Sequence, residues 1–334
     1  MKLAAIGDTH FRVDNINIVD ILIDELIRIL SERKPDIIVL LGDVLHDHER
    51  LHTIALNRAY SLIDQLRKIA PTYVLVGNHD MINHDQFLTD QHWMNAMKMW
   101  SNVTIVDKVI HEEIHGYDFI FSPYVAPGRF VEALVTNKFP WVDSDIIFAH
   151  QEFAGCKMGA IVSEIGDKWN IDSPFVVSGH IHSKQSPQEN IFYPGSSMQV
   201  AYGETEKNIV FIIELEENEL GERERREEEI ILNIPRKRIL YIDSSEFENF
   251  TISNDKDIIK LTVKGSYEDF KLLKKTVKYK NLISKGVKIS YRHSKIEEID
   301  IQKNEVVDFN NILKKLIDNE NNNFVSSAYK KIIK

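Results

Sequence analysis

The sequence contains a single cysteine, Cys156, among its 334 residues. A disulfide within the chain is therefore excluded, and the composition fits a reducing compartment. No apolar run reaches the roughly 20 residues that span a bilayer, so no membrane attachment is expected. The first apolar run is short and is interrupted by Asp8 and His10, which is not the pattern of a secretory signal. We expect an intracellular protein of the cytoplasm or nucleus, and a viral origin is compatible with this composition.

A G-x-x-x-x-G-K-[ST] phosphate loop is also missing, as is any repeat of the solenoid type. Any ATP-driven step would then have to come from another chain. The chain does have marked charge asymmetry: residues 1–234 carry 20 Lys and Arg against 37 Asp and Glu, whereas residues 235–334 carry 21 against 14. This asymmetry indicates an acidic, cation-binding part joined to a basic part that could meet a polyanion.

Short apolar runs alternate with helical patterns through the first two hundred residues. The run KLAAIG reads as a strand, and apolar residues spaced along residues 16–30 predict a helix; DIIVLLGD and the stretch 51–66 repeat the pair. The runs TYVLVGNHD, DIIFAHQE and PFVVSGHIH read as further strands. This alternation is typical of a layered α/β fold.

Each of these five strands ends in residues able to bind metal or phosphate. The motifs are GDTH at 7–10, GDVLH at 42–46, GNHD at 77–80, AHQ around His150 and GHIH at 179–182. A single Gly-Asp or Gly-Asn pair is an ordinary turn former. However, the carboxyl ends of strands in open α/β sheets border the ligand crevice, so these motifs are expected to converge. Their mixture of Asp, His and Asn suits manganese, iron or zinc better than calcium.

Two stretches also match the H-E-x-x-H pattern of zinc proteases, HERLH at 48–52 and HEEIH at 111–115. That chemistry needs both His on one face of a helix. The first match falls in or before the first turn of a helix predicted to begin near Glu49, and the second lies in a predicted hairpin with a turn at Gly116. We therefore interpret both as chance matches.

Together, the strand-end motifs resemble the calcineurin-type metallophosphoesterases, whose hallmark is D-x-H, G-D, G-N-H-D, H and G-H-x-H. The resemblance covers about residues 1–215, and every hallmark position is filled. It implies an α/β fold with a four-layer αββα metallophosphoesterase domain over residues 1–234. It also implies a hydrolase that cleaves phosphodiesters with two manganese ions, for which magnesium, iron or zinc are alternatives.

By that resemblance, seven residues would ligate the two metals. One metal would be held by Asp8, His10 and His182, the other by Asn78, His150 and His180, with Asp43 bridging. Two cations roughly 3.5 to 4 Å apart can neutralise the attacking and leaving oxygens of an in-line displacement. His79 would act as general acid or transition-state stabiliser, and Asp80 would fix its tautomer and orientation.

Narrower features resemble the double-strand-break repair nucleases of the SbcD type. In GDVLH, the family assigns the His three residues beyond the bridging Asp, here His46, to orienting the substrate phosphate. The stretch YPGSSMQVAYGETEKNIVFIIEL resembles the closing strands of that group. The chain departs from the usual pattern of this group at two places: it has Val44-Leu45 where Leu-Phe is usual, and Arg12 where Gly often follows D-x-H. The resemblance implies 3′ to 5′ exonuclease and single-strand endonuclease activity in DNA repair, recombination and replication.

The region after Pro235 reads as strand, helix, strand and is basic, with eleven Lys and Arg against two acidic residues between Lys260 and Lys295. A solvated lysine-rich face is one interpretation. The other is contact with DNA phosphates, which would make residues 235–300 a small α+β capping domain that binds DNA. Residues 301–334 predict amphipathic helices, which either pack on their own domain or, as in the resembled family, bind the coiled coil of an ABC-type ATPase of the SbcC type. That family also implies a homodimer.

Two other functions compete with the nuclease hypothesis. A metallophosphoesterase acting on small nucleotides or phosphoproteins would share the same metal core. A scaffold that has lost catalysis is disfavoured, because no expected ligand is missing.

Overall fold

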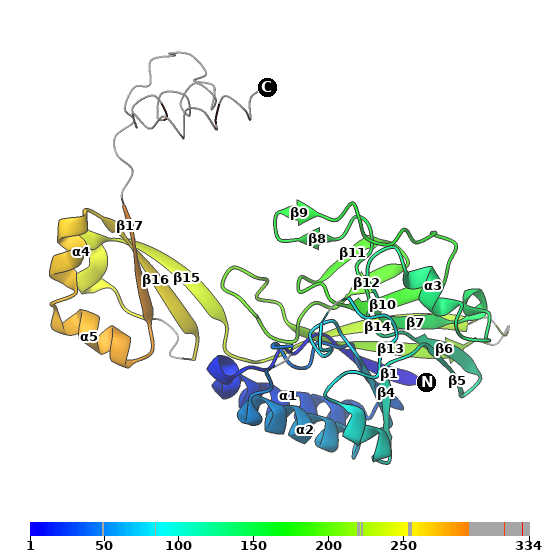
Figure 1. The fold of residues 1–334 in the computed structure, drawn as a ribbon. Helices are drawn as coiled ribbons and strands as arrows, with labels where there is room; N and C mark the ends of the chain where they lie inside the picture. The colour runs from blue at the N-terminus through cyan, green and yellow to red at the C-terminus, as the bar shows by residue number, and fades with distance from the viewer. Residues whose placement is uncertain are drawn as a thin grey trace.

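The computed structural model describes residues 1–48, 50–83, 85–218, 221, 223–252 and 256–293, and the single residues 317 and 329. Two six-stranded sheets stack face to face, and a three-stranded sheet lies beyond them toward the C-terminus (Figure 1). The predicted α/β layering is confirmed. None of the helices formed by the described residues is long and apolar enough to cross a membrane.

The first sheet has the order β14-β13-β1-β2-β3-β4. Strands β1 to β4 run parallel, and β13 pairs with β1 antiparallel. Its strands and outer helices are β1 (Lys2–Ile6), β2 (Ile37–Leu40), β3 (Thr72–Leu75), β4 (Val103–Val106), β13 (Ile209–Glu217), β14 (Arg223–Ile231), α1 (Ile16–Arg33) and α2 (Thr53–Leu66).

The second sheet has the order β11-β12-β10-β7-β6-β5, with a parallel centre and antiparallel edges. Its strands, its outer helix and a separate small hairpin are β5 (Ile110–Ile114), β6 (Tyr117–Phe121), β7 (Ile146–His150), β10 (Phe175–Gly179), β11 (Gln185–Gln188), β12 (Ile191–Tyr193), α3 (Phe130–Leu134), β8 (Lys157–Met158) and β9 (Ile161–Val162). Short 3-10 helices occupy Val13–Asn15, Asn95–Met99, Trp141–Asp143 and Ser244–Asn249.

Alternation of side chains along each strand builds the four layers. In β1, Ala4 and Ile6 face α1 and α2, whereas Leu3 and Ala5 join the core between the two sheets. That central core is aromatic and includes Phe121 with Tyr73, which stack with ring centroids 4.1 Å apart. A third core, under α3 and its flanking loops, covers the outer face of the second sheet. The sequence of helix, sheet, sheet, helix agrees with the predicted αββα arrangement.

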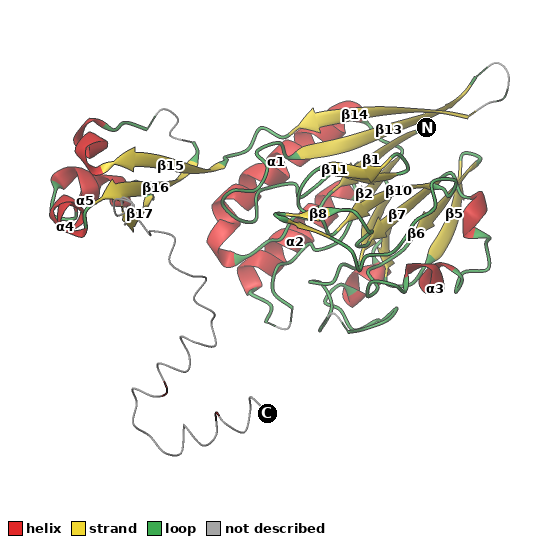
Figure 2. Cartoon of the chain, turned by 90° about the horizontal axis from the view of Figure 1, so that it is seen from above, coloured by secondary structure: helices red, strands yellow, loops and turns green. Residues whose placement is uncertain are grey.

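Beyond Pro235 lies a smaller unit with a hydrophobic core of its own, which we call the basic unit (residues 237–293). Its parallel strands are in register, with Lys260 opposite Lys288, and its helices lie on one face of the sheet (Figures 1 and 2). The elements are β15 (Lys237–Asp243), β16 (Ile258–Gly265), β17 (Lys288–His293), α4 (Tyr267–Leu273) and α5 (Val277–Ser284).

The local predictions had different outcomes. The single helix predicted between two strands after Pro235 is divided into α4 and α5, because the Thr276 hydroxyl accepts a 3.1 Å hydrogen bond from the Tyr279 amide and caps a second helix. The charged stretch after β13 forms β14, which pairs antiparallel with β13 at the edge of the first sheet. The second H-E-x-x-H match lies on β5, followed by a turn at Gly116, as predicted. Helix α2 begins only at Thr53, so His48 and His52 both precede it. The predicted C-terminal helices lie outside the described residues, apart from Ile317 and Tyr329.

Candidate metal centre

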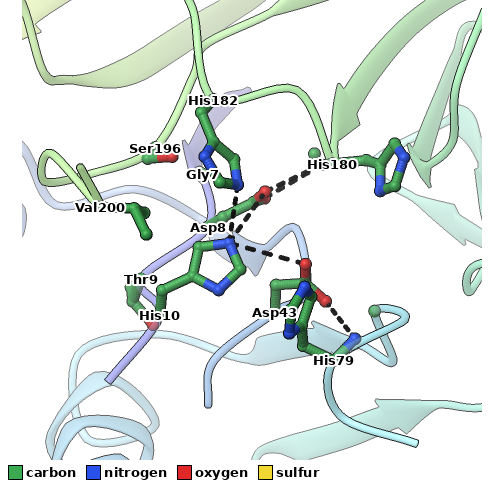
Figure 3. Close-up of polar contacts among 12 residues, drawn as sticks. Gly7, Asp8, Thr9, His10, Asp43, His79, His180, His182, Ser196 and Val200 are labelled. Atoms are coloured by element: carbon green, nitrogen blue, oxygen red, sulfur yellow. Dashed lines mark hydrogen bonds and ion pairs between the residues drawn. The ribbon is translucent and has the colours of Figure 1, made fainter. Parts of the chain in front are cut away.

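The seven predicted ligands come from five strand ends and meet at one edge of the two sheets. Asp8 and His10 follow β1, Asp43 follows β2 and Asn78 follows β3 in the first sheet. His150 ends β7, and the last two histidines follow β10 in the second sheet. Figure 3 shows Asp8, His10, Asp43 and His182, which follow β1, β2 and β10, gathered around one another. Both sheets therefore contribute to the cluster, as the strand-end rule predicts.

One set of donor atoms consists of Asp8, His10 and His182, whose ligand atoms all lie within 4.8 Å of one another. The Nε2 atoms of the two histidines are 2.9 Å apart, and His10 Nε2 is 3.9 Å from Asp8 Oδ2. Asp8 and His10 are buried, and His182 is partly exposed. This grouping equals the first predicted ligand set.

A second set consists of Asp43, His150 and His180, with donor atoms within the same 4.8 Å limit. Asn78 Oδ1 lies 3.0 Å from His150 Nε2 and 2.8 Å from His180 Nδ1, which puts it among these donors. Asp43 Oδ2 is 3.4 Å from His150 Nε2 and 3.7 Å from His10 Nε2. Asp43 therefore touches both sets, the position that a bridging ligand requires.

Three ligand candidates adopt left-handed backbone angles, with φ of 45° at His10, 49° at Asp43 and 81° at His180. Such angles are uncommon for residues other than glycine and tend to cluster at functional sites. Here they turn the chain sharply just after a strand, so that the side chain faces the opposite sheet.

A third group, His10, His46 and His79, also satisfies the distance criterion. His46 Nδ1 lies 3.3 Å from Nδ1 of His10, whereas Asp8, Asp43 and His182 lie on the Nε2 side of that ring. This group has no carboxylate, so a divalent cation is better held by the other two sets.

Each of three candidate ligand histidines has a partner on the ring nitrogen that faces away from the other donors. His150 Nδ1 is 2.6 Å from the Leu41 carbonyl oxygen, and His182 Nδ1 is 3.1 Å from Glu204 Oε1. His180 Nε2 is 3.9 Å from Glu152 Oε2. Such partners fix the tautomer and leave the inward nitrogen free for a metal. The donor set and its supports fit a pair of divalent cations.

The protonation states of the clustered residues also favour the binding of divalent cations. Burial raises the pKa of Asp8, and Asp43 raises it further while His150 opposes the rise. Burial acts against ionised Asp43 too, but His150 and His10 hold the pKa of that carboxyl well below its usual range. Burial lowers the pKa of His10, leaving it in the neutral form that binds metals. Two buried carboxylates so close together need nearby positive charge to stay ionised.

Asp80, predicted to orient the His79 ring, has other partners in the structure. Its carboxylate accepts hydrogen bonds from the backbone amides of Val44, Leu45 and Gly77 and from the Trp93 indole. Burial raises the pKa of Asp80 to about 6, and Asp43 adds to the rise. Asp80 thus ties the GDVLH loop to the GNHD loop, and the contact that orients the His79 ring comes from elsewhere.

The His79 ring is held by the loop that carries His46. His79 Nδ1 lies 2.5 Å from the His46 carbonyl oxygen, and the His79 amide donates to Asp43 Oδ1 at 2.8 Å. The ring nitrogens of His46 lie 3.3 Å from His10 Nδ1 and 3.4 Å from Arg12 Nη1. Both rings therefore border the ligand cluster, and Arg12 brings a cation beside the predicted phosphate-orienting histidine.

A pocket of about 630 Å³ opens over the cluster. Its floor is formed by ligand candidates and His79, and its walls by the β8–β9 hairpin and the loop at 203–205. Two supporting residues, Glu152 and Glu204, had no assigned role in the sequence. For Glu152, the only signal in the sequence is that it lies two residues after His150. Glu204 is the Glu of the Gly-Glu pair in the stretch that resembles the closing strands of the SbcD-type group.

Replacing Glu204 by glutamine is expected to weaken metal binding at the site that includes His182 by about 10 to 100-fold. Glutamine keeps the size of the side chain but removes the charge that raises the pKa of His182 against the opposing effect of burial. Isothermal titration of manganese into the apoprotein measures the change. Glu132→Gln, a surface carboxylate paired with Arg129, is the matched control. Equal affinities in both variants would contradict the assigned support.

Comparison with known proteins places these residues in context. The family model of calcineurin-like phosphoesterases matches residues 1–184. The protein 244L of Invertebrate iridescent virus 6 is 50% identical over 277 residues, covering 82% of this chain and 97% of that protein. The protein 078R of Invertebrate iridescent virus 3 is 45% identical over 292 residues, covering 86% and 83%. Both bear the name of a phosphoesterase. Among solved structures, an archaeal phosphodiesterase is 12% identical with a TM-score of 0.34, covering 68% of this chain and all of that chain.

Proposed function

Because the chain belongs to the calcineurin-like phosphoesterase family, and so is a hydrolase of phosphoesters that uses divalent metal ions, we propose that its substrate is DNA. The proposed activity is that of an SbcD-type nuclease, with 3′ to 5′ exonuclease and single-strand endonuclease action and manganese as the metal. The observation that carries the proposal is a group of four cations, Arg12, Lys237, Lys260 and Lys288, around the loop at 199–204, which also borders the pocket.

The open face of the three-stranded sheet is defined by strand alternation. Ile259, Leu261 and Val263 of β16 pack into the core with α4 and α5. Lys260 and Lys264 alternate with them and point to the other face, as Lys288 does on the neighbouring strand. Lysine ammonium groups on an open sheet can contact backbone phosphates without reading base sequence.

The open face adjoins the pocket through the loop at 199–204. The ammonium groups of Lys260 and Lys288 lie 6.0 and 5.8 Å from the ring centroid of Tyr202 in this loop. Lys237 donates to the Val200 carbonyl oxygen at 2.8 Å, and Arg12 donates to the same oxygen at 3.2 Å. Burial lowers the pKa of Lys237, and the neighbouring Arg12 lowers it further. Arg12 also pairs with Asp14, and Lys237 is buried, so Lys260 and Lys288 are the cations of this group that could contact a polyanion.

In the proposed reaction, the first donor set would hold one cation and the second set with Asn78 the other, with Asp43 between them. Two bound divalent cations supply Lewis acidity toward the attacking and leaving oxygens of the phosphoryl displacement. His79 Nδ1 faces a carbonyl oxygen, which only accepts hydrogen bonds, so that nitrogen carries a proton. Its Nε2 is then free to exchange a proton with the substrate. Arg12, beside His46, would hold a phosphate oxygen.

The remaining parts of the proposal concern partners. The basic unit would be a capping domain for the DNA, residues 301–334 would bind an ABC-type coiled-coil ATPase, and two copies would form a homodimer. The sequence resemblance motivates these steps, and the absence of a phosphate loop from the sequence is consistent with an ATPase on another chain.

Cleavage of linear DNA in manganese is the direct test, and EDTA is expected to abolish it until manganese is restored in excess. The substrate class is tested by the variant Lys260→Ala/Lys264→Ala/Lys288→Ala. We expect at least about tenfold weaker DNA binding, and a salt slope that is smaller by up to about three, because each phosphate contact contributes about one. Hydrolysis of bis(p-nitrophenyl) phosphate should stay unchanged.

The matched control is Lys271→Ala/Lys275→Ala/Lys280→Ala, which removes the same charge from exposed positions on α4, on α5 and in the turn between them. If the two triple variants bind and cleave DNA equally, the open face is not the DNA surface. A wild-type protein that hydrolyses only the small diester would favour small nucleotides or phosphoproteins as substrates instead.

A further inference from the structure

The β8–β9 hairpin carries a concentration of exposed aliphatic side chains beside the candidate metal centre. In the hairpin, Met158, Ile161 and Val162 are 39%, 66% and 50% exposed, and Ile165, just beyond it, is 76% exposed. Single exposed apolar residues are common on protein surfaces, but Met158 and Ile161 are cross-strand partners and so present two aliphatic side chains on one face of the hairpin. In Figure 1 the hairpin projects from the second sheet.

The hairpin forms one wall of the pocket. Lys157, Met158 and Gly159 line it, facing a floor that includes Asp43, His79 and His180. A phosphate on that floor would place whatever group it carries against this wall. The ammonium of Lys157 suits a neighbouring phosphate, and the aliphatic side chains suit an uncharged, flat group.

The base of the hairpin is tied to the second sheet. The Gly155 amide donates to the Ser163 carbonyl oxygen and the Ser163 amide to the Cys156 carbonyl oxygen, both at 2.8 Å. The Lys157 amide donates to Gln185 Oε1 at 2.7 Å, and Gln185 Nε2 returns a 2.9 Å bond to the Lys157 carbonyl oxygen. These bonds hold the hairpin at a fixed position relative to the pocket floor.

A further bond connects the hairpin to the metal centre. The Ser163 hydroxyl donates to Glu152, whose other carboxylate oxygen lies 3.9 Å from His180 Nε2. The wall and a ligand candidate therefore share one supporting carboxylate. The fixed wall and the fixed floor together define which group can accompany a bound phosphate.

We propose that the β8–β9 hairpin is the base-contacting wall of the site, in which Met158 and Ile161 pack against the nucleobase next to the scissile phosphate. This inference rests on the proposed nuclease function. Aliphatic side chains contact any base without discriminating its sequence, as expected of a nuclease without sequence preference. Lys157 contacts the phosphate of the adjoining nucleotide.

The test compares two single-stranded oligonucleotides of equal length in manganese, one normal and one with abasic tetrahydrofuran nucleotides flanking every cleavable position. For the wild type, kcat/KM should be about tenfold higher on the normal strand, the lower part of the range for base contacts. In Met158→Ser/Ile161→Ser, this preference should fall below about twofold, while the rate on the abasic strand stays unchanged. Both side chains are solvent-exposed, so serine should not impair folding.

The matched control is Val131→Ser/Val135→Ser, exposed positions at α3 that should keep the full preference. The inference is overturned if the wild type cleaves both strands equally, or if the hairpin variant keeps the preference. The second result would instead favour a protein partner for the exposed aliphatic side chains. A wild type that hydrolyses bis(p-nitrophenyl) phosphate but neither oligonucleotide would overturn the proposed function and this inference with it.

Discussion

Replacing Asp43 by asparagine is expected to lower kcat/KM for phosphodiester hydrolysis on the order of a thousandfold, with loss of stable binding of two metal ions. Asp43 is the carboxylate that touches both donor sets, through contacts of 3.4 Å to His150 and 3.7 Å to His10. Without its charge, two cations placed side by side would repel each other unscreened.

Asparagine tests charge with little change in shape. It keeps an oxygen that can accept the 2.8 Å hydrogen bond from the His79 amide, and it tolerates the left-handed φ of 49° found at this position. The measurements are manganese-dependent hydrolysis of bis(p-nitrophenyl) phosphate and the metal content of the dialysed protein. Asp24→Asn, an exposed position on α1, is the matched control. Two bound metals and a rate within tenfold of wild type would contradict the bridging role.

The strand-end motifs predicted the composition of this cluster because their positions follow from topology alone. Once β1, β2 and β3 run parallel and β7 and β10 do the same in the second sheet, their carboxyl ends must border a common edge. The side chains that follow them in the sequence are then neighbours in space. The prediction of the four layers depended on the same alternation of strands and helices.

The supporting residues could not be predicted in this way. Glu204 reaches His182 from a loop that follows the second sheet, and Asp80 reaches Trp93 across a long connection. These contacts depend on how loops pack, which no periodicity in the sequence records. The assignment of Asp80 to the neighbouring His79 was an inference from adjacency along the chain. In the structure, the Asp80 carboxylate accepts from the backbone amide of Val44 in another loop and from that of Gly77 in its own loop, which satisfies this buried group.

Strand β15 was missed for a related reason. Its sequence KRILYID carries charge at both ends, whereas buried parallel strands usually read as continuous apolar runs. It lies at the edge of its sheet, where Lys237 is satisfied by the Gln199 side chain and the Val200 carbonyl oxygen. The charged residue at its start is thus a contact between the basic unit and the loop beside the pocket.

The glycines of the strand-end motifs do more than form turns, which is the role that the sequence suggested for them. A Cβ atom at Gly42 would lie 2.5 Å from His150 Nδ1, and one at Gly77 would lie 2.2 Å from Asp43 Oδ1. A Cβ at Gly179 would lie 2.5 Å from the Leu41 carbonyl oxygen and 2.6 Å from Asp8 Oδ1. Because each glycine lacks a Cβ, an atom from another strand end can approach its backbone closely. That atom belongs either to a ligand candidate or to the backbone beside one. The glycines are therefore required for the strand ends, and the ligand candidates on them, to come close together.

Gly179→Ala is accordingly expected to destabilise the protein by about 1 to 3 kcal/mol through overpacking. It should also lower kcat/KM by about a hundredfold, because a misplacement of about 1 Å at a catalytic centre has that effect. Gly179 does not have a left-handed backbone, so alanine adds no conformational strain there. Both expected losses therefore come from steric overlap. Thermal unfolding and manganese-dependent hydrolysis measure the two effects. Manganese affinity should fall as well, because Asp8 and His150 are the side chains displaced.

Gly128→Ala separates steric overlap from backbone strain. Gly128 has a φ of 85°, and a Cβ added there would meet no atom within 4 Å, so alanine costs only the strain of a left-handed residue, about 1 to 2 kcal/mol. Its stability should thus fall by an amount similar to that of Gly179→Ala while hydrolysis and metal affinity remain at the wild-type level. If both variants retained full activity, the glycines at the strand ends would serve the turns alone. If only Gly179→Ala loses metal, the close approach of the two sheets is what assembles the ligands.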